Sequence, residues 1–189
     1  MSFLDDIRGL LRGIDALNAI VAKIVAWVTI PLVLFIAYEV VMRYAFNRPT
    51  LWVFDVQYLL TSMVVILGAG YTLHGKGHVS VDIFYERFSP RWKAFFDVFF
   101  YLLLFFTLWI LVINVTVPHV INSWQRGERA STGIWRPVIY PFKAWILLGV
   151  VLLTLQGVAE FFRSAYILVT GKPLDKTRKS GGQSEEILL

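Results

Sequence analysis

Four long stretches of apolar residues, separated by shorter polar segments, set the pattern of this chain. They cover residues about 19–42, 51–73, 96–120 and 140–162, and their centres carry no Asp, Glu, Lys or Arg. Within each stretch the apolar residues are continuous, which is typical of membrane helices, whereas barrel strands alternate apolar and polar residues. A helix needs about 20 such residues to cross roughly 30 Å of hydrocarbon. The pattern therefore predicts an all-α integral membrane protein with four transmembrane helices, forming one membrane domain over residues 1–170.

Two further segments have the spacing of short amphipathic helices at the membrane surface. Residues 3–16 place apolar side chains at helical spacing, with the charged residues largely off that stripe, and this predicts an amphipathic helix that lies on the membrane and leads into the first span. A simple extension of the first helix is the alternative. Residues 81–88 also share an apolar face, which favours a second interfacial helix. Ser89 and Pro90 are then the expected N-cap and first residue of the third helix.

The distribution of Lys and Arg predicts the orientation of the four spans. Twelve of the 18 Lys and Arg lie in the N-terminal segment up to Lys23, in the 74–97 loop or in the tail from Glu160, and six lie in the 43–55 and 119–143 segments. The positive-inside rule then predicts that both termini are cytoplasmic. The polar, glycine-rich residues 171–189 are expected to form a disordered cytoplasmic tail. Because the basic residues are scattered between apolar blocks, the net charge of +5 does not indicate nucleic-acid binding.

The composition argues against catalytic chemistry. The chain is 57% hydrophobic and 16% charged, which excludes an ordinary soluble enzyme of this length, because such domains are roughly 45–50% apolar and about 25% charged. The lack of cysteine excludes disulfides, thiolate catalysis and Cys-ligated metals. His74, His78 and His119 lie outside the apolar centres, whereas a bis-histidine haem needs ligands on facing spans. Gly75 and Gly77 favour a loop around the first two histidines. We therefore expect no catalytic residues, no cofactor and no metal site.

Charged residues near the ends of the first two spans give one candidate contact site. Glu39 and Arg43 are four residues apart, so they share a helix face and can pair. Asp55, at the start of the next span, could join them. Such a group is consistent either with a structural ion cluster that orients the two helices or with a contact to a partner subunit.

Small residues in the second and fourth spans give candidate helix-packing surfaces. Gly68 and Gly70 lie in the second span, and Gly149 and Gly157 lie in the fourth. Small residues let another helix approach closely, although a glycine that faces lipid is also tolerated. Gln156, beside Gly157, would need an interhelical hydrogen bond if it is buried.

The loop before the fourth span is unusually basic for a segment on the outer side of the membrane. Its candidate residues are Trp124, Arg126, Glu128, Arg129 and Arg136. Positive charge there opposes the insertion bias, and Arg and Trp are enriched at binding hot spots. The loop is therefore either an ordinary solvated segment or a docking surface for an acidic partner on that side of the membrane.

Several motifs, taken in order, are similar to those of one membrane protein family. They are the run Arg43 to Pro49 (RYAFNRP), Trp52 followed by Asp55, Leu67 to Gly70 (LGAG), and Gly77-His78-Val79 with Asp82. Together they resemble the DctQ-like small membrane subunit of tripartite ATP-independent periplasmic (TRAP) transporters, over residues about 15–165. The chain departs from the family pattern at Phe54 and Asp55, where many members carry paired glutamates.

The resemblance implies a role without chemistry of its own. It implies a multi-pass subunit of the bacterial inner membrane that braces a large permease subunit, which carries the substrate and sodium sites. It also implies that the small subunit helps to dock a periplasmic substrate-binding protein, which delivers an organic acid. The large-subunit interface would then draw on Glu39, Arg43, Trp52, Asp55, Gly68 and Gly70. The alternatives are a membrane anchor of a respiratory or other multi-subunit complex, and a homo-oligomeric channel.

Overall fold

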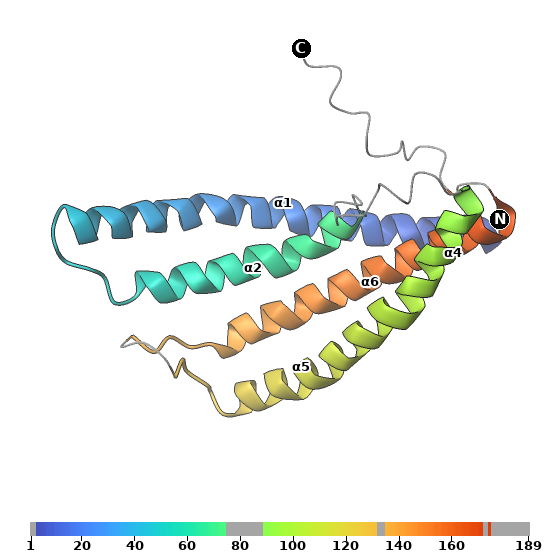
Figure 1. Cartoon of the computed structure of the whole chain (residues 1–189). Helices are drawn as coiled ribbons and strands as arrows, with labels where there is room; N and C mark the ends of the chain where they lie inside the picture. The colour runs from blue at the N-terminus through green and yellow to red at the C-terminus, as the bar shows by residue number, and fades with distance from the viewer. Residues whose placement is uncertain (1–2, 75–88, 132–134, 172–173, 175–189) are drawn as a thin grey trace, which may run out of the picture.

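The structure, a computed structural model of the whole chain, describes residues 3–74, 89–131, 135–171 and 174 (Figure 1). Its helices are α1 (Phe3–Tyr44), α2 (Val53–His74), α4 (Pro90–Phe100), the π-helix η1 (Tyr101–Phe106), α5 (Thr107–Gln125) and α6 (Tyr140–Thr170). Four helical stretches are long and apolar enough to cross a membrane, because α4, η1 and α5 follow one another without a break. No strand forms within the described residues, so the expected all-α fold is confirmed.

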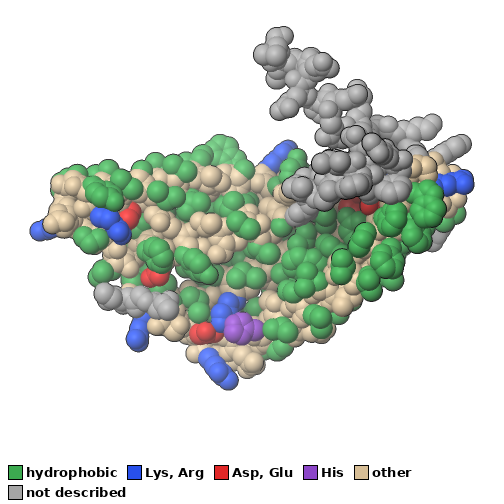
Figure 2. All heavy atoms as spheres, in the orientation of Figure 1, with side chains coloured by type: hydrophobic (Ala, Val, Ile, Leu, Met, Phe, Trp, Pro, Cys, Tyr) green, Lys and Arg blue, Asp and Glu red, His purple; other side chains and the backbone are tan. Residues whose placement is uncertain are grey.

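The four spans lie side by side in a row rather than in a closed bundle. Figure 1 shows the order α1, α2, α6 and α5, and each helix packs mainly on its neighbours in that row. A small apolar core forms where α1, α2 and α6 meet, built on Val25, Leu67 and Leu152. Because a row has two broad faces, much of the apolar surface of the helices remains exposed, as the face drawn in Figure 2 shows.

Helix α1 is one continuous helix, which corrects the predicted surface helix at residues 3–16. Its 42 residues span about 63 Å at 1.5 Å per residue, roughly twice the thickness of the hydrocarbon core. Ile7, Leu11 and Ile14 of the apolar stripe pack in a cluster with α6, whereas Leu10 is 68% exposed. Leu11 is buried against Ala159 of α6 and against Leu174. The extension of the first helix is therefore the correct alternative.

The ends of the other helices follow local rules. Helix α4 begins at Pro90 after Ser89 in the N-cap position, as the sequence predicts. Helix α6 ends at Thr170, and Gly171 adopts a left-handed φ of 70° as its C-cap, a conformation that glycine takes without steric penalty. The second predicted interfacial helix, at residues 81–88, and all of the predicted disordered tail except Gly171 and Leu174 lie outside the described residues.

The third span is interrupted by η1, a feature that the sequence does not predict. In Figure 1 the span formed by α4, η1 and α5 curves along its length. Helix α4 crosses α6, and α5 lies beside α6. A π-helical turn carries extra backbone and is a recognised source of bending. Here it places the ring of Phe105 over Gly157 of α6, where an added Cβ would lie only 2.0 Å from the ring. Gly157 therefore makes room for the curved helix.

Candidate functional site

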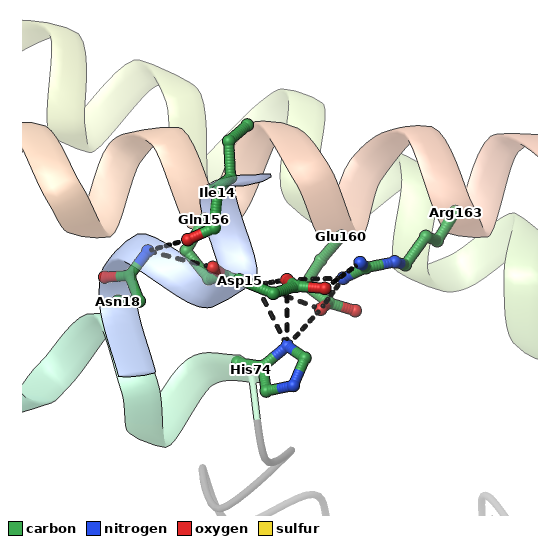
Figure 3. A network of polar contacts seen from close by, with 7 residues as sticks. All are labelled: Ile14, Asp15, Asn18, His74, Gln156, Glu160 and Arg163. Carbon is green, nitrogen blue, oxygen red and sulfur yellow. Dashed lines mark hydrogen bonds and ion pairs between the residues drawn. The ribbon is translucent and has the colours of Figure 1, made fainter. Parts of the chain in front are cut away.

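A group of polar side chains joins three helices at the point where α2 ends (Figure 3). Helices α1 and α6 continue beyond His74, the last residue of α2, and contact each other. The group, called the polar network below, consists of Asp15 and Asn18 from α1, His74 from α2, and Gln156, Glu160 and Arg163 from α6. The α6 members are spaced by four and three residues, so they share one helix face.

Arg163 is the central charge of the polar network. Its Nη1 donates hydrogen bonds to Oε1 of Glu160 at 2.7 Å and to Oδ1 of Asp15 at 3.2 Å. Its Nη2 pairs with Oδ2 of Asp15. The side chains of Arg163 and Glu160 are 9% and 7% exposed, and that of Asp15 is 19% exposed. One guanidinium thus bridges two largely desolvated carboxylates and ties α1 to α6.

Two side-chain amides extend the polar network toward the centre of the row. Gln156 is completely buried, and its Nε2 donates to Oδ1 of Asp15 at 2.9 Å while its Oε1 accepts from Nδ2 of Asn18 at 3.0 Å. The expected interhelical hydrogen bond of Gln156 is therefore confirmed. Asn18 also donates to the carbonyl of Ile14 at 3.2 Å, which holds its amide in place between α1 and α2.

Gly70 makes room for that amide. A Cβ at Gly70 would lie 2.2 Å from Oδ1 of Asn18, whereas a Cβ at Gly68 would meet nothing within 4 Å. The two candidate glycines therefore differ. Gly70 allows a close contact with Asn18 inside this chain, whereas Gly68 faces open space outside it.

His74 belongs to the polar network rather than to a loop, which corrects the expectation drawn from the neighbouring glycines. Its Nδ1 lies 3.0 Å from Oδ1 of Asp15 and 3.3 Å from Nε2 of Gln156. His119 lies in α5, and His78 is outside the described residues.

Asp15, His74 and Glu160 also resemble a metal-binding set, since one ligand atom from each lies within 4.8 Å of the others. The same oxygens already accept hydrogen bonds, Oε1 of Glu160 from Arg163 and Oδ1 of Asp15 from Arg163 and Gln156. A cation would have to displace these donors and sit beside the guanidinium. The arrangement therefore fits a cross-link between helices better than a metal centre.

At the opposite end of the row, Glu39 organises the turn between α1 and α2. Oε1 of Glu39 accepts from Nη2 of Arg43 at 2.8 Å. Its other oxygen accepts from the backbone N–H of Thr50 at 3.2 Å and from the Thr50 hydroxyl. Asp55 makes no ion pair with Arg43 among the described residues, and its Oδ2 is buried without a hydrogen-bond partner. The suggested three-residue cluster is thus Glu39, Arg43 and Thr50.

Trp52 is part of an aromatic group at the same end. Its ring centroid lies 5.7 Å from that of Phe35, 6.2 Å from that of Tyr38 and 6.5 Å from that of Trp135. Aromatic residues of this kind are enriched at the level of lipid headgroups. Trp52 therefore connects α1 to the loop before α6 within the chain itself.

The five candidate docking residues differ in the contacts that they make within the chain. Trp124 packs on Tyr140 with ring centroids 4.7 Å apart. Glu128 pairs with Lys143 at 2.5 Å, and the Lys143 ammonium holds the pKa of this carboxyl below its usual value. Arg126 is exposed at the end of α5. Arg129 and Arg136 line a cavity beside α2.

Comparison with known families now bears on the function. The family of tripartite ATP-independent periplasmic transporters, DctQ component, matches residues 32–166. This chain belongs to the DctQ family. As a DctQ component it is the small membrane subunit of a TRAP transporter, a transport component rather than an enzyme, and a multi-pass protein of the inner membrane. Comparisons with curated proteins and with solved structures give no match.

Sequence reasoning missed five members of the polar network of this DctQ chain: Asp15, Asn18, His74, Glu160 and Arg163. One signal was available in the sequence. Gln156, Glu160 and Arg163 follow one another at helical spacing near the end of the apolar stretch that forms α6. Such an aligned set needs partners on a facing helix. The partners on α1 lie upstream of the stretch that matches the family.

Proposed function

We propose that this DctQ chain is the scaffold subunit of a sodium-coupled importer of organic acids, of the carboxylate or sulfonate class. In this proposal it braces the large permease subunit and helps to dock the periplasmic substrate-binding protein. Substrate and sodium are handled by the large subunit. The large subunit contacts Gly68 and Trp52. It also contacts Glu39, Arg43 and Asp55, which lie close to the turn between α1 and α2.

The row arrangement of the helices is the observation that carries this proposal. The α4–α5 span is strongly apolar, yet none of the residues in its most apolar stretch is buried inside the chain. Large apolar side chains are also exposed along α1, including Trp27 and Leu34 at 73% and 63%. Lipid can cover one face of such a row, and the other suits a broad membrane partner. The buried charges of the polar network satisfy one another, which suits a rigid brace better than an ion pathway.

The orientation proposed for this scaffold places both termini in the cytoplasm. It is supported by the sequence, in which twelve of the 18 Lys and Arg lie in the N-terminal segment up to Lys23, in the 74–97 loop or in the segment from Glu160 onward. The loop between α5 and α6 then lies in the periplasm, where a soluble binding protein can reach it.

Reconstitution of the parts tests the scaffold role. The chain alone in liposomes should give neither uptake of labelled organic acids nor ion conductance. The chain with its large subunit and binding protein should give uptake that depends on a sodium gradient, and the two membrane subunits should co-purify. Uptake or conductance by the chain alone, or failure of the two subunits to co-purify, would contradict the proposal.

Docking of the binding protein is tested at Arg126, which is exposed and makes no ion pair with any described residue. Arg126→Glu should slow uptake several-fold at low ionic strength and flatten its salt dependence, because charges at the rim of an interface mainly set the association rate. Assembly of the membrane subunits should be unchanged, and Arg126→Lys should keep most of the rate. An unchanged rate of uptake at low salt in Arg126→Glu would show that Arg126 does not contribute to docking.

The proposed orientation is tested by cysteine labelling. Ser131→Cys should react with an impermeant maleimide in spheroplasts while Ser2→Cys does not.

A further inference from the structure

The loop before α6 and the start of α2 enclose a cavity of about 350 Å³, within the usual range for small-ligand sites. Its α2 wall is apolar and consists of Val56, Leu59 and Leu60, and Phe142 of α6 continues that wall. Arg129 and Arg136 line its loop side. Asp55, the neighbour of Val56 in the sequence, does not line the cavity. One side is therefore hydrocarbon and the other carries two guanidinium groups.

Backbone hydrogen bonds hold the two arginines together. Arg129 and Val138 form an antiparallel bridge, and the N–H of Ala130 donates to the carbonyl of Pro137 at 2.9 Å. Arg136 adopts a left-handed φ of 45° directly before Pro137. Non-glycine residues take this conformation only where the surrounding structure imposes it, and such residues cluster at binding sites. The loop thus fixes both arginines at the edge of the cavity.

The positive charge of these arginines is not neutralised within the described part of the chain. Neither Arg129 nor Arg136 forms an ion pair there, and the nearest loop acid, Glu128, is bound to Lys143. A guanidinium presents planar donors that match phosphate oxygens in a two-point geometry. Two such groups at one cavity edge therefore favour a phosphate or a similar anion.

The level of the cavity relative to the membrane surface indicates the source of that anion. Trp135, which also lines the cavity, lies edge-to-face with Trp52 in the aromatic group described above. Aromatic groups of this kind sit at the level of lipid headgroups. The α2 wall continues from that level along an apolar helix toward the centre of the membrane. An occupant with a phosphate at the arginines and hydrocarbon along α2 satisfies both halves of the cavity.

We propose that this cavity binds an anionic phospholipid of the adjoining leaflet. Its phosphodiester lies between Arg129 and Arg136, and an acyl chain follows Val56, Leu59 and Leu60. The bound lipid holds the loop against α2. This inference goes beyond the scaffold role and does not depend on it, since it concerns a ligand of the small subunit itself.

Native mass spectrometry of the full chain in detergent tests the proposal with phosphatidylglycerol as the probe. The wild type should bind phosphatidylglycerol in preference to phosphatidylcholine, and millimolar inorganic phosphate should not displace it. Arg129→Gln/Arg136→Gln should weaken binding by about tenfold to a hundredfold, because charge-assisted hydrogen bonds are lost. The control Arg48→Gln/Arg126→Gln removes the same charge from exposed arginines at the same end and should bind as the wild type does.

A second variant tests the apolar half of the cavity without changing charge. Leu59→Trp should fill the cavity and reduce lipid binding to a similar degree. Equal binding by wild type and the Arg129→Gln/Arg136→Gln variant would overturn the proposal. Displacement by inorganic phosphate would instead indicate a free-anion site. If the Arg129→Gln/Arg136→Gln variant kept its lipid binding but lost docking of the binding protein, the two arginines would form a protein interface. Displacement by phosphate and loss of docking alone would each also overturn the lipid proposal.

Discussion

Replacing Arg163 with methionine should lower the free energy of unfolding of this chain by about 3–5 kcal/mol. The substitution keeps an unbranched apolar side chain but leaves the carboxylates of Asp15 and Glu160 facing each other, with their side chains 19% and 7% exposed. Removing one partner of a buried ion pair is costly because the remaining charge has lost its water and gains nothing in return. Thermal unfolding of the purified chain in detergent measures the effect.

Two controls separate loss of charge pairing from loss of side-chain packing. Lys143→Met also breaks an ion pair, but its partner Glu128 is 39% exposed, so this variant should be destabilised much less than Arg163→Met. The triple variant Asp15→Asn/Glu160→Gln/Arg163→Gln removes all three charges together and should recover most of the stability of the wild type. If Arg163→Met is as mild as Lys143→Met, the polar network does not brace the helices.

Replacing Gly70 with alanine should destabilise the chain by about 1–3 kcal/mol through overpacking. The new Cβ would lie 2.2 Å from Oδ1 and 3.1 Å from Cγ of Asn18. Asn18 cannot move away freely, because its Nδ2 donates to Gln156 and to the carbonyl of Ile14. Relief of the clash therefore breaks a buried hydrogen bond or separates α1 from α2. The same unfolding assay measures the loss.

Gly68→Ala is the matched control for that substitution. It lies two residues away on the same helix, and its Cβ would meet nothing within 4 Å. Because alanine is a better helix former than glycine, this variant should be as stable as the wild type or slightly more stable. Equal destabilisation by both variants would show that glycine is needed for helix flexibility and not for the contact with Asn18.

The row of helices gives the proposed scaffold role of this DctQ chain a physical basis. A row of helices exposes two broad apolar faces, and a lone row buries little surface of its own. The polar network cross-links α1, α2 and α6 at one end, and the Glu39 group fixes the α1–α2 turn at the other. A row held at both ends can keep its shape against a large membrane partner.

Much of the fold follows from local pattern alone. Long apolar runs predict the four spans, because any segment in hydrocarbon must satisfy its own backbone and needs about 20 residues to cross. The start of α4 at Pro90 and the pairing of Glu39 with Arg43 also depend only on near neighbours in the sequence. Each of these features is decided within one helix or one turn.

Other features depend on which helices become neighbours. Ile7, Leu11 and Ile14 of the 3–16 stripe pack in one cluster with residues of α6, more than 100 positions away in the sequence. Gly70 and Gly68 are alike in the sequence and differ only because Asn18 lies against one of them. The hydrogen bonds and ion pairs between α1 and α6 in the polar network join residues 138 to 148 positions apart. Helical spacing shows which side chains share a face, but only the packing of the row decides what that face meets.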